Sequence, residues 1–388
     1  MKDNPMLWRV PVILIGLVLL LSVYYVVNKP ITPELALNLG GALLDLLTVA
    51  ALFAVGGGLG EAVLRRIGLP SADDDARLER LASAALIGLG LIALYALVVS
   101  LIGLFNALAL WGGLLLIAIV THRALIGWIG GVWTALRGLR PAPGGFRRFP
   151  AVFLGVMLAL AVGVALAPPF SWDSLVYHLV GPQRYLDAGR MTAHADNFYL
   201  GMPKNGEMLF SIAISLFGRA TTAALIHVGF GLIMLALTGS IARRHAGALG
   251  GWLAAALLLG SFNLWQLFGF SYVDLALTAY GAVVYALLLR WREQPSDWLL
   301  IVVGVLVGLA MGYKYTAVFI AAGVALLILI QAPRRVLRNG LIAAIPAVIM
   351  FAPWLLRGWL LYGNPVYPML GFGLAWDAER SAMFTRSF

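Results

Sequence analysis

Long apolar runs without charged residues recur along nearly the whole sequence, and this feature restricts the chain to few folds. Helical runs of about twenty apolar residues match the hydrocarbon thickness of a bilayer. Strands of a transmembrane barrel are shorter and alternate between apolar and polar residues, whereas these runs are apolar on all sides. A content of 62% hydrophobic and 11% charged residues also argues against a soluble domain. The sequence therefore predicts an all-α polytopic membrane protein.

The apolar runs place about eleven transmembrane helices along the chain. The segment 205–217 has apolar residues at helical spacing and is interpreted as a helix along the outer interface, not as a span. The expected spans are residues 11–27, 36–56, 81–103, 105–121, 150–167, 220–241, 247–265, 273–290, 297–313, 315–332 and 340–360.

The distribution of Lys and Arg gives an orientation to these spans. One set of loops carries roughly twice as many basic residues as the other, and the richer side normally faces the cytoplasm. The protein is therefore expected in the cytoplasmic (inner) membrane, with its N-terminus on the cytoplasmic side and residues 168–219 and 363–388 on the extracytoplasmic side. The formal net charge of +10 is explained by this topology, and no nucleic-acid partner is predicted.

A linker rich in Pro, Gly and Arg at 141–149 divides the chain into two expected parts. Residues 1–140 are predicted to form an N-terminal four-helix membrane bundle. Residues 150–362 are predicted to form a seven-helix core that includes the outside loop 168–219, and residues 363–388 are an outside tail. No internal repeat is evident, which argues against a transporter built from inverted halves.

Asp173 lies in the sequence PPFSWDSLVYHL, just beyond the outer end of the fifth expected span. A carboxylate at that level can accept a proton from a hydroxyl group held within hydrogen-bond reach. Because a helical pattern follows at 175–186, Asp173 also suits the N-cap of that helix. The two roles are compatible, and Asp173 is a candidate general base.

Three more charged residues are expected at the same outer level. Asp274 begins the eighth span, Lys314 lies between the ninth and tenth spans, and Arg357 falls near the outer end of the last. Charges at such positions are costly and usually face a cavity, a partner or a substrate. Either cation can instead extend to the lipid headgroups. Together they suit an anionic phosphate.

The remaining polar residues carry weaker signals. Tyr177 and His178 follow Asp173 on the expected helix, where polar residues are usually solvated. His178 and His194 show no recognised metal-ligand spacing, so no metal site is predicted, although a divalent cation is left open. His227, like Asp45, is a lone polar residue within a span, for which we expect a role in helix packing. The absence of cysteine excludes disulfides and thiolate chemistry.

A series of short motifs in a fixed order resembles a known superfamily. Between residues 150 and 370 the series is WDSLVYHL, PQRYLDAG, MPKNGEMLF, SYVDLAL, GYKYTA and RGWLLYGNPVYP. It resembles the GT-C glycosyltransferases, and more narrowly the phospholipid carrier-dependent glycosyltransferases related to protein mannosyltransferases and aminoarabinose transferases. Members of that family share a seven-helix core, and the first outside loop of this core carries an acidic catalytic residue. The seven spans expected after the linker resemble that core. Asp173 occupies the equivalent place here.

The resemblance implies transfer of a sugar from a polyprenyl-phosphate donor to a hydroxyl acceptor on the extracytoplasmic face. Asp173 would act as general base, and a single displacement would invert the anomeric carbon. Lys314 and Arg357 would bind the donor phosphate and stabilise its departing charge. The implied partners are the lipid-linked donor, an unidentified glycan, lipid or protein acceptor, and membrane lipids, and no cofactor is implied. The supporting or sugar-binding residues would be Asp274, His178, Tyr177 and Glu207.

A transporter or flippase of a lipid-linked glycan is the alternative function, because it would use the same basic groups to carry the phosphate. Such proteins place charges near the membrane midplane and use paired helices broken by Gly or Pro. In this sequence the charges are concentrated near one face, which favours the enzyme. A non-catalytic membrane scaffold is a third class.

Overall fold

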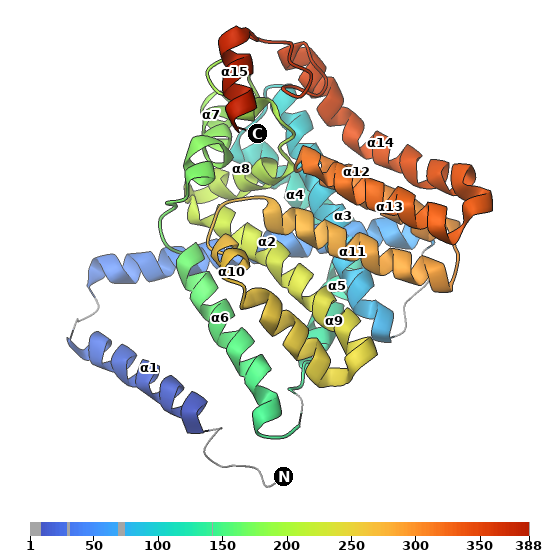
Figure 1. The fold of residues 1–388 in the computed structure, drawn as a ribbon. Coiled ribbons are helices and arrows are strands. Elements are labelled where there is room, and N and C mark those ends of the chain that lie inside the picture. Colours follow the sequence, from blue (N-terminus) through green and yellow to red (C-terminus); the bar gives the residue numbers. More distant parts are fainter. Residues whose placement is uncertain (1–8, 29–31, 69–73, 142, 388) are drawn as a thin grey trace.

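The computed structural model describes residues 9–28, 32–68, 74–141 and 143–387. Within these ranges the chain forms helices joined by turns and contains no β-strand (Figure 1). This confirms the all-α fold expected from the apolar runs.

The described residues of the N-terminal part form five helices. The helix α1 and the first half of α2 extend away from the body of the molecule and expose leucine and valine side chains (Figure 1). The second half of α2 packs tightly along α3, because an added Cβ on Gly60 would lie 1.8 Å from the Ala84 carbonyl oxygen. The five helices are α1 (Arg9–Asn28), α2 (Pro33–Ile67), α3 (Asp74–Leu101), α4 (Ala107–Val120) and α5 (His122–Arg137).

The helix α5 was not among the expected spans. It meets α4 at an angle of 85°. Its sequence HRALIGWIGGVWTALR is apolar on one side and polar on the other, a pattern typical of helices that lie along a membrane surface. The expected spans were placed from runs of apolar residues, and the polar side of α5 interrupts such a run.

Six longer helices make up the frame of the second part. α9 breaks at Ala246 and Gly247, where Gly247 has a φ of 67°, and the chain then reverses (Figure 1). Gly251 on the returning arm lies against Gly239, so the two arms pack side by side. The sequence predicted two spans here, at 220–241 and 247–265, whereas the returning arm ends at Leu259. The six helices are α6 (Phe149–Ala165), α9 (Thr221–Leu259), α11 (Asp274–Glu293), α12 (Asp297–Met311), α13 (Val318–Gln331) and α14 (Val336–Tyr362).

Six of the described helices are long and apolar enough to cross a membrane, or seven if α4 and α5 form one bent span. The sequence predicted about eleven. The number of six counts the two arms of α9 as one helix. It also leaves out α12 and α13, because they have only 15 and 14 residues. The polytopic membrane character is therefore confirmed, while the exact number of crossings stays a prediction.

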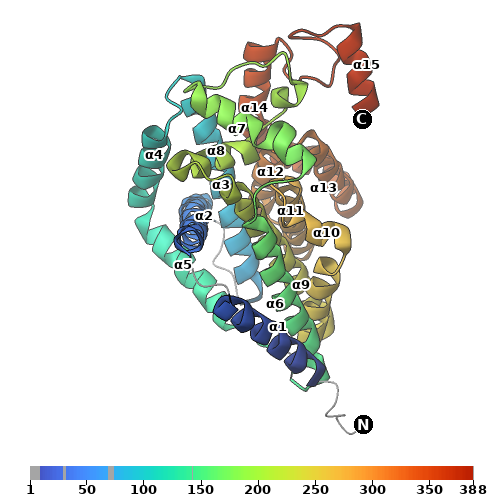
Figure 2. The same cartoon turned by 90° about the vertical axis from the view of Figure 1, so that its left-hand side faces the viewer.

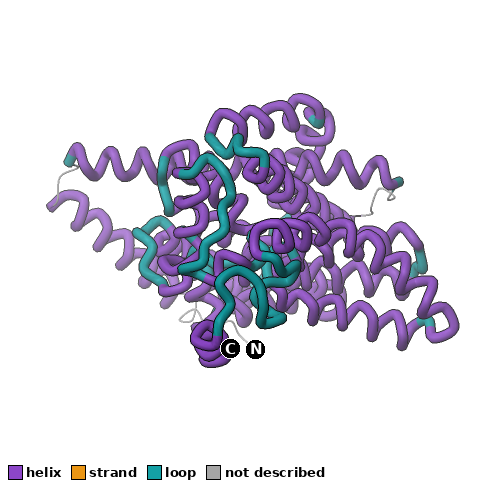
Figure 3. Tube along the Cα trace, turned by 90° about the horizontal axis from the view of Figure 1, so that it is seen from above, coloured by secondary structure: helices purple, strands orange, loops and turns teal. Residues whose placement is uncertain are grey.

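One end of the molecule carries the segment between α6 and α9, and we call it the outer end. Figure 2 places α7, α8 and α15 there, and Figure 3, viewed from that side, shows loops crossing over the helix ends. The elements of the outer end are η2 (Ser174–His178), α7 (Val180–Asp187), η3 (Phe198–Gly201), α8 (Asn205–Phe217) and α15 (Ala378–Ser387), with the short α10 (Phe262–Leu267) and η4 (Tyr315–Ala317) nearby.

The helix α8 is buried inside the protein and does not lie on its surface. Ten of its 13 residues are buried, and it packs against α3, α7 and α9. The sequence had placed this segment along the membrane interface. A helix that is apolar on nearly all sides is covered by other helices rather than by lipid on one face, which explains the difference.

The two parts of the chain share one contiguous hydrophobic core. The Tyr280 hydroxyl donates a hydrogen bond to the Leu86 carbonyl (2.6 Å), and the Trp111 indole donates to the Ile212 carbonyl (2.9 Å). Asp45 on α2 pairs with Arg219 (2.7 Å), just before α9, in the helix-packing role expected for it. The division at 141–149 stays a prediction.

Candidate active site

Asp173 stands directly before a π-helical turn, η2, at the outer end. Its φ and ψ of −61° and −35° are helical, and its side chain makes no capping hydrogen bond. The N-cap role considered from the sequence is therefore not observed. Single π-helical turns are rare and frequently occur at functional sites, so the local backbone favours a chemical role for this carboxylate.

Two tyrosines hold Asp173. The Tyr177 hydroxyl hydrogen-bonds the Asp173 carboxylate, and the backbone N–H of Asp173 donates to the Tyr272 hydroxyl oxygen at 3.3 Å. Burial raises the pKa of the Tyr177 phenol, and the bond to Asp173 raises it further. Tyr177 therefore stays protonated and acts as the donor in this bond.

A buried ion pair lies beneath Tyr177. Glu207 Oε1 accepts hydrogen bonds from Lys204 Nζ at 2.9 Å and from His178 Nδ1 at 2.8 Å, and all three residues are at most 3% exposed. Lys204 Nζ also lies 4.9 Å from the centre of the Tyr177 ring. These contacts connect the ion pair to Asp173 through Tyr177.

The charges within this network can be assigned from their surroundings. Burial alone would raise the pKa of Glu207, but the ammonium group of Lys204 and the imidazole of His178 outweigh it and lower the pKa to about 2. Burial lowers the pKa of His178 in spite of Glu207. Glu207 is therefore ionised at pH 7 and His178 is neutral, while burial lowers the pKa of Lys204 against the opposing effect of Glu207.

Lys204 is the member of the network that sequence reasoning missed. It lies in the polar motif MPKNGEML, where a lysine is usually solvated. The only local signal is the spacing of three residues to Glu207, which brings the two side chains together at the start of α8. Such spacing is common on exposed helices, so it does not by itself indicate a buried pair.

Asp274 and Lys314, two of the charged residues expected at the outer level, form an ion pair. Lys314 Nζ donates to Asp274 Oδ1 at 2.9 Å, and the two side chains are 37% and 32% exposed. The charge of Asp274 also acts on Tyr177 and His178, which places the pair beside the buried network. The structure thus gathers Asp173 and the predicted residues of α8, α11 and the α12–η4 turn at one end of the helices.

His227 positions the segment that carries Tyr272 and Asp274. Its Nε2 accepts a hydrogen bond from the Leu275 backbone N–H at 2.7 Å. Its Nδ1 must then carry the proton, and it donates to the carbonyls of Leu267 and Phe270, each at 3.0 Å. The packing role expected for this histidine is therefore specific, because it ties α9 to the turn before α11.

Arg357 does not reach the outer surface. It is 1% exposed, and its guanidinium donates to the carbonyls of Gly201 (2.6 Å) and Leu200 (2.7 Å), so it holds η3 in place. The sequence had suggested a cation available to a phosphate. These contacts give Arg357 a structural role, and its contact with a donor phosphate stays a prediction.

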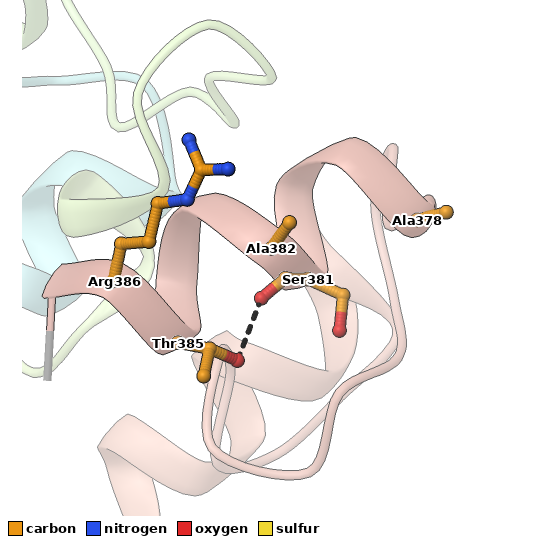
Figure 4. A pocket seen from close by; sticks show the side chains of 5 residues that line it. All are labelled: Ala378, Ser381, Ala382, Thr385 and Arg386. Atoms are coloured by element: carbon orange, nitrogen blue, oxygen red, sulfur yellow. Dashed lines mark hydrogen bonds between the residues drawn. The ribbon is translucent and has the colours of Figure 1, made fainter.

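The surface has one depression beside the site and another on α15. An apolar groove of about 190 Å³ adjoins it, since the Phe270 ring in its wall lies 5.1 Å from the Tyr272 ring. An open depression on α15 (Figure 4) is lined by none of the predicted site residues. The groove is lined by Val164, Phe170, Phe262, Trp265, Gln266 and Phe270.

The fold and the gathered polar residues define a multi-pass membrane protein with a polar centre at one end of its helices. Residues 205–356 match the family described as dolichyl-phosphate-mannose-protein mannosyltransferase. This match relates the chain to the GT-C superfamily and supports a membrane glycosyltransferase of that type. The matched segment contains Glu207, Asp274 and Lys314, whereas Asp173 lies before it and Arg357 directly after it. No curated protein and no solved structure matches the chain significantly.

Proposed function

We propose that this protein transfers a sugar from a polyprenyl-phosphate donor to a hydroxyl acceptor on the extracytoplasmic face of the cytoplasmic membrane. One observation carries the proposal: a carboxylate without a capping role, Asp173, stands at the same end of the helices as the half-exposed Asp274–Lys314 pair. A base and a cation are the two groups that displacement of a phosphate by a hydroxyl requires.

In the proposed reaction the acceptor oxygen attacks the anomeric carbon while Asp173 takes the hydroxyl proton. The bond between the anomeric carbon and the phosphate oxygen breaks on the opposite face, and its electrons pass to the phosphate. This single displacement inverts the anomeric carbon. Lys314 meets the charge that develops on the departing phosphate, and Asp274 orients Lys314 through their hydrogen bond.

The apolar groove beside the site suits the polyprenyl chain of the donor. It is walled mainly by aromatic side chains, and Phe170 and Phe270 meet edge to face at 5.5 Å. A chain lying in this groove would leave its phosphate near the polar residues, because the groove adjoins Tyr272. This arrangement matches a substrate with an apolar tail and a charged head.

A transfer assay with the purified protein in vesicles tests the function. Polyprenyl phosphates carrying a radiolabelled hexose or pentose are supplied together with native membranes as a source of acceptor. We expect label to enter a membrane product while free polyprenyl phosphate accumulates. Transbilayer movement of lipid-linked glycan without any cleavage of the donors would instead establish the flippase alternative.

Lys314→Met should lower kcat/KM for the donor by about 10- to 100-fold, because a hydrogen bond to a charged group contributes about 1.5–3 kcal/mol. The substitution preserves most of the side-chain length and removes the charge together with the hydrogen bond to Asp274. The matched control is Arg190→Met, which removes an exposed charge from the same end of the molecule. Equal losses in the two variants would exclude Lys314 from the donor site.

A further inference from the structure

The helix α5 presents an apolar face that the protein does not cover. Another face packs against α2 and α3, where Trp128 lies across Gly57 and its indole donates a hydrogen bond to the Leu81 carbonyl at 3.0 Å. The apolar side chains of the uncovered face are between 45% and 66% exposed, and they are Ile126, Ile129, Trp133 and Leu136. Their spacing of three and four residues puts them on one side of the helix, so they form a continuous apolar stripe.

The stretch from the start of α5 to the start of α6 is also strongly basic. The sequence contains no Asp or Glu between Glu79 and Asp173, so this stretch supplies no counter-charge of its own. In the part of the chain that the structure describes, none of its arginines is paired with a carboxylate. The exposed arginines are Arg123, Arg137, Arg140, Arg147 and Arg148.

We call α5, Arg140 and the short helix η1 (Phe146–Arg148) together the α5–η1 surface. Figures 1 and 2 place the start of α6, which follows η1, at the end of the molecule opposite α15. The surface borders α9, because the Trp252 indole donates a hydrogen bond to the Arg140 carbonyl at 3.0 Å. The excess of basic residues assigns this end to the cytoplasmic side of the membrane.

The apolar stripe and the arginines together select the partner of this surface. The Arg137 guanidinium lies 4.7 Å from the centre of the Trp133 ring, so a cation and an exposed tryptophan stand at one level, as they do at a membrane interface. A second copy of the same surface would bring arginines against arginines. A nucleic acid would leave the stripe in water. An anionic phospholipid offers acyl chains for the stripe and a phosphate for the arginines.

We propose that the α5–η1 surface binds anionic phospholipids of the leaflet at this end of the molecule. Their acyl chains cover Ile126 and Ile129, and their phosphates accept hydrogen bonds from Arg137 and Arg140. The bound lipid also supports the junction between the two parts of the chain, since Arg140 is joined to α9 through Trp252. The surface is separate from the candidate active site, so this inference does not depend on the proposed sugar transfer.

The test measures binding of fluorescent phosphatidylglycerol to the purified protein in neutral detergent, with phosphatidylcholine of the same acyl chains as the reference lipid. An arginine near an anionic headgroup strengthens binding about fivefold. The double variant Arg137→Gln/Arg140→Gln should therefore bind phosphatidylglycerol about 25-fold more weakly and keep its affinity for phosphatidylcholine. Equal binding of the two lipids by the unmodified protein would overturn the proposal, as would an unchanged preference in the double variant.

The matched control is Arg190→Gln/Arg386→Gln, which removes the same charge from two exposed positions at the outer end. This control should keep the full preference for phosphatidylglycerol, and an equal loss would reduce the effect to net charge and overturn the assignment to the α5–η1 surface. Ile126→Ser separates the apolar contribution, because it should weaken the binding of both lipids by the same factor and leave their ratio unchanged. A change in that ratio would contradict the placement of the acyl chains.

Salt and free phosphate test the unmodified protein, independently of whether any variant folds. Raising the NaCl concentration from about 0.1 M to about 1 M shortens the screening length from about 10 Å to about 3 Å, so most of the preference for phosphatidylglycerol should disappear. A preference that survives this salt would overturn the role of the arginines. Displacement of the lipid by millimolar inorganic phosphate would show that a free anion suffices, and it would overturn a lipid as the ligand.

Discussion

Asp173→Asn should lower the rate of sugar transfer by about 1,000-fold, within the range that a positioned general base contributes. The substitution keeps the shape of the side chain and an oxygen that can accept the Tyr177 hydroxyl. It removes the basicity that the acceptor proton requires. Thermal stability and donor binding should therefore stay close to those of the unmodified protein, and initial rates with saturating labelled donor give the measurement.

The matched control for this experiment is Asp187→Asn. Asp187 lies on α7 at the same end of the molecule, is exposed, and accepts a hydrogen bond from Gln183 at 2.7 Å. Its substitution should leave the transfer rate within about twofold of the unmodified protein, since exposed side chains away from special features contribute little. Similar rates for the two variants would remove Asp173 as the base.

Glu207→Gln should destabilise the protein by about 3–5 kcal/mol, because it leaves the ammonium group of Lys204 buried without a counter-charge. Both side chains are at most 2% exposed, so solvent does not screen the loss. The glutamine carbonyl still accepts from His178, which limits the change to the charge. Denaturant unfolding in detergent, followed by tryptophan fluorescence, gives the free energy of unfolding.

The double variant Lys204→Met/Glu207→Gln provides the control for that measurement. With both charges removed, the apolar methionine fills the volume of the lysine stem, and most of the lost stability should return. Such recovery identifies the interaction between the two residues, as in a double-mutant cycle. A double variant less stable than Glu207→Gln would show that Lys204 contributes through packing rather than through its charge.

Much of the site was predictable from the order of charged residues. Asp274 and Lys314 are separated by 40 positions, yet each lies at the outer end of an apolar run, so a common level was expected. Their direct hydrogen bond follows from the packing of α11 near α12. Asp173 was recognised for the same reason, although its π-helical turn carries no sequence signal of its own.

The burial of two cations could not be predicted from the sequence. Arg357 was interpreted through its residue type, as a cation for an anionic ligand, and Lys204 was not singled out, because lysine is usually solvated. The structure buries both, and the carbonyls that bind Arg357 lie 156 and 157 positions away in the sequence. Burial of a charged side chain depends on partners that the local sequence does not contain.

The sequence by itself determined that this chain folds in a membrane and that its backbone is helical. It also determined at which end of the helices the charged residues collect. These properties are local, because hydrophobicity and backbone hydrogen bonding within a run of about twenty residues decide whether it enters a membrane as a helix. Only the tertiary structure decided which polar groups meet. That outcome depends on hydrogen bonds between distant segments, such as the 2.8 Å contact between His178 and Glu207, whose geometry exists only once the helices have packed.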